Sequence, residues 1–325
     1  MRATVEWTQK HQVALFLLAI AAGGVFGMLA PGPAQRLEVA ITPVLGALLY
    51  VTFLGVPFRD LGRALRGGRF LVGALVINFV VVPIVVFALS RFVVGDEPVL
   101  LGVLLVLLAP CVDYVIVFAG LAGGDRARLL ALTPLLLIAQ VVLLPGYVWV
   151  MAGEQVLAAV DLRPFASAFL WLIIVPLGLA VLTQLAAGRW RAAHRVSGVG
   201  LAAMVPLMML TLAIVVASQV PGVRDSWTDL LVALPLFAVF PFIAAVLGAF
   251  GGRLLRLGRP DRIALTFSAA TRNSLVVLPL ALALPPAYAL TPVVVVSQTL
   301  VELLAMLVLV AVAPRVFRRT DGQRR

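Results

Sequence analysis

The sequence predicts an all-α polytopic membrane protein with ten transmembrane helices, arranged as two inverted five-helix repeats. Three observations lead to this fold class. Apolar residues make up 63% of the 325 residues, charged residues make up only 12%, and the mean hydropathy is +1.13. Apolar stretches long enough to cross about 30 Å of hydrocarbon recur along the whole chain. The basic residues gather in alternate connecting segments, as expected for a chain that crosses a bilayer repeatedly.

The ten predicted spans are apolar stretches with few or no charged residues. Those of the first repeat, 12–151, are 12–30, 39–57, 70–90, 99–122 and 129–151. Those of the second repeat, 164–313, are 164–187, 200–220, 230–250, 263–285 and 292–313. Because each half has an odd number of spans, the halves face opposite ways, which defines an inverted repeat. No connection is long enough for a soluble domain, so residues 1–325 are predicted to form one membrane transporter unit.

The basic residues predict the orientation, since positively charged loops stay cytoplasmic. With both termini inside, only four of the 25 Lys and Arg residues lie outside, and one lies within a span. The four outside are Arg36, Arg91, Arg163 and Arg224. The Arg-rich composition is typical of a bacterium with a GC-rich genome, so we expect the bacterial inner membrane. The basic residues are spread over six short cytoplasmic segments rather than gathered on one soluble face, so we expect lipid and not nucleic acid as partner. With one cysteine, the chain has no internal disulfide and no multi-cysteine metal site, and no cofactor is expected.

The fourth and ninth spans carry helix-breaking or polar residues near the middle of the bilayer. Pro110 and Ser274 each lie about twelve residues into a span, roughly 18 Å at 1.5 Å per residue. Pro110 removes a backbone donor, and the polar run from Thr271 to Ser274 can satisfy freed backbone groups. Broken helices are tolerated at this depth only inside protein or beside water. We therefore expect these two helices to be discontinuous and to cross.

Three charged residues lie deep in spans: Asp113, Arg272 and Glu302. Each would cost about 2.5–3.5 kcal/mol at the bilayer centre, so they are expected to face the protein interior. Asp113 and Arg272 have opposite charge and similar depth, which predicts an ion pair that is either a structural clamp or a substrate-binding or gating element.

Uncharged polar residues and a cysteine accompany these charges. A supporting polar lining is predicted from Pro110, Thr133, Gln140, Thr271, Ser274, Gln298 and Thr299. Cys111 is either a small buried hydrophobic residue or a soft ligand for a thiophilic solute such as trivalent arsenic. A single thiol would bind such a solute transiently, which suits transport because the solute must also leave.

At these residues the sequence resembles the arsenite-permease branch of the bile acid:sodium symporter superfamily. The resemblance lies in Ala109-Pro110-Cys111, in the segment from Phe267 to Ser274 and in Leu300-Val301-Glu302. It implies a ten-helix fold with a core and a panel domain, helices 4 and 9 crossing in the core. It also implies efflux of arsenite, and sometimes antimonite, by proton antiport. On this resemblance Cys111 is needed for translocation, Glu302 is a membrane carboxylate of the permeases, and Asn273 is a polar position of the helix 9 motif.

The sequence departs from this branch at three positions. The family commonly has a glutamate where this chain has Leu275, a non-basic polar residue at Arg272 and an uncharged residue at Asp113. If the helix 9 glutamate couples protons, that role here passes to Glu302 or Asp113, or coupling differs. No acid stands in helix 9, so the sodium-binding pattern of the bile-acid branch is not evident.

The leading hypothesis is therefore an alternating-access antiporter in which arsenite contacts Cys111 and a proton binds Glu302. One alternative is transport of a small organic anion whose carboxylate is gripped by Arg272. Another is an intramembrane enzyme that uses Asp113 and Glu302, but the chain has no Gly-x-Gly-Asp, His-Glu-x-x-His or Gly-x-Ser-x-Gly motif. A receptor or scaffold is a third alternative. We expect no enzyme activity.

Overall fold

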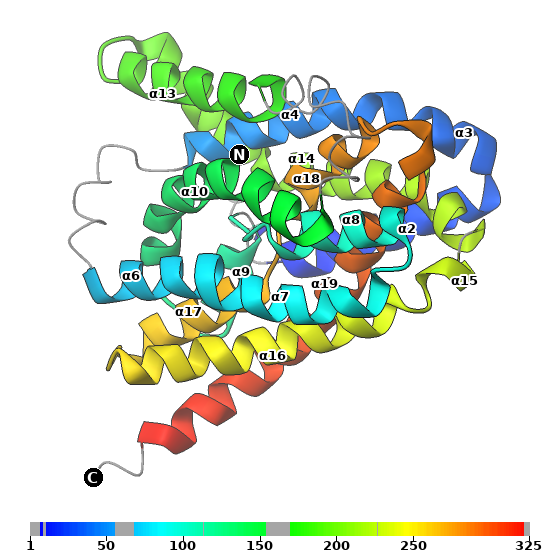
Figure 1. The fold of residues 1–325 in the computed structure, drawn as a ribbon. Helices are drawn as coiled ribbons and strands as arrows, with labels where there is room; N and C mark the ends of the chain where they lie inside the picture. Colours follow the sequence, from blue (N-terminus) through cyan, green and yellow to red (C-terminus); the bar gives the residue numbers. More distant parts are fainter. Residues whose placement is uncertain are drawn as a thin grey trace. The chain divides into compact units, whose positions relative to one another are not determined.

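The computed structural model describes residues 7–8, 11–55, 68–112, 114–153, 170–225 and 227–321 (Figure 1). These residues are helical and contain no named strand; the extended backbone among them forms one isolated bridge. Five helical segments are long and apolar enough to cross a membrane: Gly68–Val93, Arg126–Ala152, Arg191–Pro221, Ala233–Leu254 and Pro286–Phe317. Shorter apolar helices lie at Ala14–Leu29, Glu38–Leu54, Glu97–Leu107 and Val175–Ala187. The prediction of an all-helical membrane protein is confirmed.

The helices form two compact units, and each unit takes segments from both predicted sequence halves. The first comprises Met1–Val56, Asp161–Trp227 and Leu278–Val296, and the second comprises Pro57–Val160, Thr228–Val277 and Ser297–Arg325. Hydropathy locates apolar segments but does not report which segments pack together, so this interleaving has no signal in the composition.

The first unit contains α14 and the helices that pack together with it. Its helices are α2 (Gln12–Leu29), α3 (Pro31–Arg36), α4 (Glu38–Leu54), η4 (Leu170–Ile174), α13 (Val175–Ala187) and α14 (Arg191–Asp225). The unit also holds the end of α18, the turn η5 (Pro286–Tyr288) and the start of α19, while the short α15 (Trp227–Leu230) spans the division. The short α3 was not predicted from the sequence.

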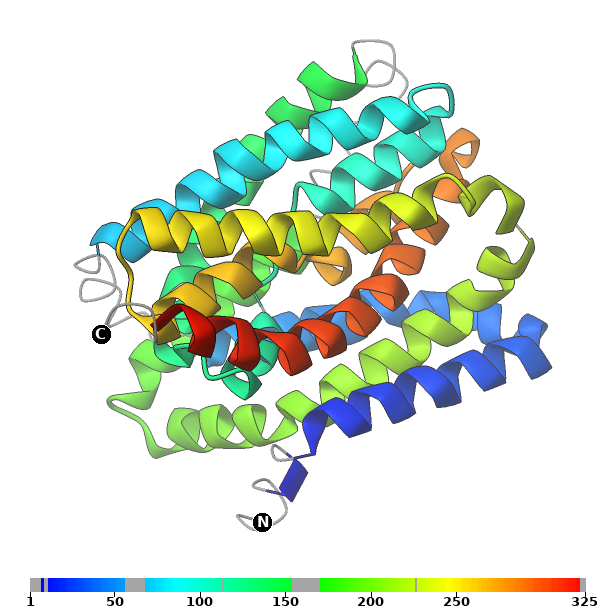
Figure 2. The same cartoon turned by 90° about the horizontal axis from the view of Figure 1, so that it is seen from below.

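Small residues on α2 allow close contact with α14, along which it lies in Figure 2. A Cβ atom added at Gly23 would lie 2.5 Å from the carbonyl oxygen of Ala213, and one at Gly27 would lie 2.6 Å from that of Ala217. This spacing of small residues four apart is the one that lets membrane helices approach at the backbone.

Polar side chains join α4 to α13 within the same unit. The Tyr50 hydroxyl lies 2.9 Å from Thr183 Oγ1. Gln184 Nε2 donates to the carbonyl oxygens of Phe53 and Leu54, at 3.2 and 3.1 Å. These carbonyls lie in the last turn of α4, where a helix leaves carbonyl groups open to donors from outside it, and the amide supplies such a donor.

The second unit contains both broken helices. Its helices are α6 (Gly68–Val76), η2 (Ile77–Val81), α7 (Val82–Ser90), η3 (Arg91–Val93), α8 (Glu97–Leu107), α9 (Val115–Leu121), α10 (Arg126–Ala152), α16 (Ala233–Leu254) and α17 (Arg259–Ala270). The start of α18 (Ser274–Leu282) and the part of α19 (Leu290–Asp321) from Ser297 complete it. Most helices lie within a few residues of the predicted spans, but α14 begins at Arg191 rather than at 200 and α19 continues to Asp321 rather than ending at 313. Residues 56–57 and 164–169 of the predicted spans lie outside the described residues.

A π-helical turn, η2, interrupts the segment that runs from α6 to α7. Pro83 follows it and has no N–H to donate to the carbonyl of Phe79, four residues earlier. The Tyr147 hydroxyl of α10 donates to this carbonyl instead. The turn therefore has an identifiable cause, and it positions Asn78 in the interior of the unit.

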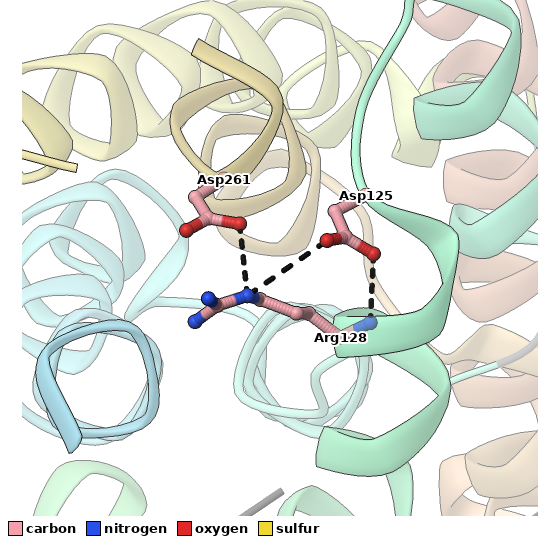
Figure 3. A network of polar contacts seen from close by, with 3 residues as sticks. All are labelled: Asp125, Arg128 and Asp261. Carbon is pink, nitrogen blue, oxygen red and sulfur yellow. Dashed lines mark hydrogen bonds and ion pairs between the residues drawn. The ribbon is translucent and has the colours of Figure 1, made fainter. Parts of the chain in front are cut away.

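One end of α10 is fixed by a charged network, drawn in Figure 3. Asp125 caps the helix by accepting from the Arg128 backbone N at 3.1 Å. Arg128 Nε lies 3.1 Å from Asp261 Oδ1 and 3.8 Å from Asp125 Oδ2. Partial burial raises the pKa of Asp261 above its usual value, while Arg128 acts in the opposite direction. The network joins the start of α10 to the first turn of α17.

Candidate functional site

Both predicted helix breaks are present in the second unit. The fourth span divides into α8, which ends at Leu107, and α9, which begins at Val115. The ninth span divides into α17, which ends at Ala270, and α18, which begins at Ser274. The two extended segments cross in an isolated antiparallel bridge in which Pro110 faces Arg272. The predictions of discontinuity and crossing are therefore confirmed.

The bridge consists of two backbone hydrogen bonds on either side of the facing pair. Cys111 N donates to Thr271 O at 3.2 Å, and Asn273 N donates to Ala109 O at 2.7 Å. In such a pair the two central residues do not bond to each other through their own peptide groups. Proline is compatible with this position because its nitrogen is not required as a donor. The peptide groups of Arg272 are thereby left available for other partners.

Glu302 and Tyr114 form hydrogen bonds with these peptide groups of Arg272. The Arg272 backbone N donates to both carboxylate oxygens of Glu302, at 2.9 and 3.1 Å. The Tyr114 hydroxyl lies 2.9 Å from Arg272 O and 2.8 Å from Glu302 Oε1, so its proton has two acceptors available. Gln298 Nε2, one turn earlier on α19, donates to Glu302 Oε2 at 2.5 Å. Glu302 is fully buried, and its carboxylate links α19 to the break between α17 and α18.

The guanidinium group of Arg272 points to four oxygen atoms of the same unit. Nη2 donates to Asn78 Oδ1 at 2.9 Å, to Ser268 O at 2.9 Å and to Ala269 O at 2.5 Å. Nη1 donates to Leu107 O at 3.4 Å. The side chain is fully buried, and its guanidinium carbon lies 5.4 Å from the centre of the Phe240 ring, a cation–π contact.

The predicted ion pair between Asp113 and Arg272 stays a prediction, because Asp113 lies outside the described residues. The side chain of Leu275 is likewise outside them. Within the residues that the structure describes, the guanidinium is stabilised by neutral oxygens rather than by a carboxylate, since Glu302 bonds to the backbone N of Arg272.

Asn78, Tyr114 and Ser268 belong to this arrangement but were not singled out from the sequence. Asn78 Nδ2 donates to Ala74 O at 3.0 Å and to Ser268 Oγ at 3.1 Å, which fixes its Oδ1 toward Arg272. A signal was present for Asn78, because it is the sole amide in an otherwise apolar span. For Tyr114 the signal was weaker, since tyrosine is common in membrane helices.

The remaining predicted site residues lie at or near the crossing, or on the helices beside it. Cys111 is buried, with 1% of its surface exposed, and Thr271 Oγ1 donates to Phe267 O at 2.6 Å. Asn273 Oδ1 accepts from Val276 N at 3.3 Å and so caps α18. Thr133 Oγ1 donates to Leu129 O at 3.1 Å within α10. Gln140 and Thr299 are buried on α10 and α19.

Several buried polar atoms at the crossing have no hydrogen-bond partner among the described residues. They are Arg272 Nε, Asn273 Nδ2 and Gln298 Oε1, and Gln140 Oε1 on α10 shares this property. Buried polar groups are normally hydrogen-bonded, so such a set marks a place where a ligand or water is expected. Within the described residues no three His, Cys, Asp or Glu side chains are grouped to hold a metal ion.

Comparison with protein-family models assigns residues 42–222 to the Sodium Bile acid symporter family. The chain belongs to this family. The matched region covers the break between α8 and α9, whereas α17, α18 and Glu302 lie beyond it. No curated protein sequence matches the chain.

Membership in the Sodium Bile acid symporter family makes the chain an ion-coupled transporter and an integral membrane protein, not an enzyme. The crossing of broken helices agrees with this class, because irregular backbone at membrane depth is found where solutes and ions bind in transporters.

Proposed function

We propose that this protein exports arsenite, and also antimonite, across a bacterial inner membrane in exchange for protons. In this proposal ten transmembrane helices form two inverted repeats with both termini cytoplasmic, and the solute binds where α8–α9 crosses α17–α18. The observation that carries the proposal is the position of Cys111, buried in the bridge beside polar atoms that have no partner among the described residues.

The chemistry of arsenite suits these groups. Trivalent arsenic is soft and prefers a thiol, while its three hydroxyl groups donate and accept hydrogen bonds. Asn273 Nδ2 is a donor and Gln298 Oε1 is an acceptor, and the buried Ser274 hydroxyl can act as either. One thiol with hydrogen-bonding neighbours binds such a solute reversibly, as transport requires.

Glu302 is proposed as the proton-binding group. Its carboxylate accepts from the Arg272 backbone N, from Tyr114 and from Gln298. A proton on either oxygen converts an acceptor into a donor, so at least one of these bonds must break or reverse. Proton binding would thereby remove the negative charge that strengthens the bonds between α19 and the break between α17 and α18, which would favour a backbone rearrangement. Asp113 is proposed to stay charged near Arg272.

The proposal is tested by arsenite accumulation in arsenic-sensitive cells that express the wild type, Cys111→Ala or Cys111→Ser at equal membrane levels. We expect the wild type to lower accumulation and both variants to lose this effect. Export that persists in Cys111→Ser would exclude the thiol as the arsenic ligand. Glu302→Gln, measured in everted vesicles with an imposed proton gradient, should abolish the dependence of efflux on that gradient.

A second candidate is transport of a small organic anion, favoured by the bile acid named in the family description. In that case Arg272 would bind the carboxylate. The four protein oxygens already bonded to its guanidinium disfavour this role. Inhibition by carboxylates of transport that survives in Cys111→Ala would support it.

A further inference from the structure

The four oxygen atoms bonded to the Arg272 guanidinium have a common origin in the helix breaks. Leu107 is the last residue of α8, and Ser268 and Ala269 lie in the last turn of α17. Carbonyl groups of a last turn have no intrahelical donor and carry the negative end of the helix dipole. Two helix ends therefore direct unpaired carbonyl oxygens at one buried point. We call Asn78 Oδ1, Leu107 O, Ser268 O and Ala269 O the oxygen cage.

The oxygen cage has the chemistry of a binding site for a small monovalent cation. Transporters with discontinuous helices coordinate Na⁺ through unwound backbone carbonyls and the C-terminal ends of half-helices. The cage consists of three such carbonyls and one side-chain amide oxygen, all neutral and buried. Here the positive charge is supplied by the protein itself, because the guanidinium is covalently part of the bridge residue Arg272.

The cage oxygens are oriented independently of the guanidinium. Asn78 is held by its own donor bonds to Ala74 O and Ser268 Oγ, and the carbonyls belong to α8 and α17. The bridge that brings the helix ends together uses the backbone of residues 109, 111, 271 and 273, not the Arg272 side chain. Removal of the side chain would thus leave the cage oxygens in place without their cation.

We propose that the Arg272 guanidinium is a tethered cation that occupies a Na⁺-type site, so this symporter-family protein works without Na⁺. Replacement of Arg272 by a small neutral residue opens the cage to Na⁺. The statement about transport rests on the proposed function, whereas the statement about Na⁺ binding is measured without any transported solute, so the two can fail separately.

The test compares thermal unfolding of detergent-purified protein in NaCl and in choline chloride at equal ionic strength, together with equilibrium binding of radiolabelled Na⁺. We expect the wild type to unfold at the same temperature in both salts and to bind no Na⁺. Arg272→Ala and Arg272→Gln should unfold at a higher temperature in NaCl than in choline chloride, and should bind Na⁺ saturably where the wild type shows no saturable binding. Addition of Asn78→Leu to Arg272→Ala should remove this response.

Arg262→Ala is the matched control, because Arg262 is a buried arginine on α17, the helix that ends just before Arg272, and contacts the Phe317 ring outside the cage. It should show no response to Na⁺. Stabilisation of the wild type by Na⁺, or absence of Na⁺ binding by both Arg272 variants, overturns the proposal. Variants that cannot be recovered folded even in high NaCl also count against it, since Na⁺ should restore the missing charge.

Discussion

Loss of the Glu302 carboxylate should destabilise the protein by an amount that depends on what replaces it. In Glu302→Ala three donors lose their acceptor: the Arg272 backbone N, the Tyr114 hydroxyl and the Gln298 amide. Each buried donor left unsatisfied costs about 1–3 kcal/mol. The Tyr114 proton can turn to Arg272 O, 2.9 Å away, which reduces the total. We expect the free energy of unfolding to fall by about 3–5 kcal/mol.

Glu302→Gln should cost far less, because an amide can satisfy the same groups. Its oxygen, placed at the position of Oε2, accepts from the Arg272 N and from Gln298. Its nitrogen, placed at the position of Oε1, donates to the Tyr114 hydroxyl, which then donates to Arg272 O. The charge assistance of the bonds and the longer bond from the Arg272 N to Oε1 are lost, so we expect about 1–2 kcal/mol.

Reversible unfolding in mixed micelles, followed by circular dichroism, measures both variants. Glu38→Gln is the control, since Glu38 is exposed in the first turn of α4 and should change stability by less than about 0.5 kcal/mol. Equal stabilities for Glu302→Ala and Glu302→Gln would refute the assignment of three donors to this carboxylate.

Three further changes test other parts of the fold. Gly23→Ala places a Cβ 2.5 Å from a carbonyl oxygen of α14 and should lower the unfolding free energy by about 1–3 kcal/mol. Gly32→Ala is the control, because a Cβ there meets open space, and equal effects of the two changes would contradict the close packing. Asn78→Leu leaves the Arg272 guanidinium short of one acceptor and should lower the unfolding temperature in detergent; no change would show that this bond is dispensable. Burial raises the pKa of Asp261 above 3.8 in the folded protein. The stability of the wild type relative to Asp261→Asn should therefore fall as the pH rises from below 3.8, and should level off above the raised pKa. A difference between the two unfolding temperatures that does not vary with pH would contradict this prediction.

The helix breaks could be predicted from the sequence because their causes are local. Proline at 110 and the polar run from 271 to 274 interrupt apolar spans, and both breaks lie there in the structure. Glu302 was also predicted to face the protein interior, because a carboxylate in lipid is too costly. It is fully buried.

The partners of Arg272 could not be predicted, because most of them are backbone carbonyls, which every residue has. Sequence reasoning looked for an opposite charge, whereas the described partners are helix-end oxygens and one asparagine. Asn78 is brought to the site by a π-helical turn, whose cause is a proline that follows and a tyrosine from another helix. Such a turn depends on tertiary contacts and has no reliable local signature.

The antiparallel bridge at the crossing has a consequence for how this protein can evolve. Its two hydrogen bonds join main-chain atoms only, so residues 109, 111, 271 and 273 keep the helices crossed whatever side chains they carry, proline at 111 or 273 excepted. The main-chain bonds that hold the two helices crossed are thus independent of the side chains that would contact a solute. Substitutions of the thiol at 111 or the amide at 273 can change which solute is recognised while the chain keeps the same path through the membrane.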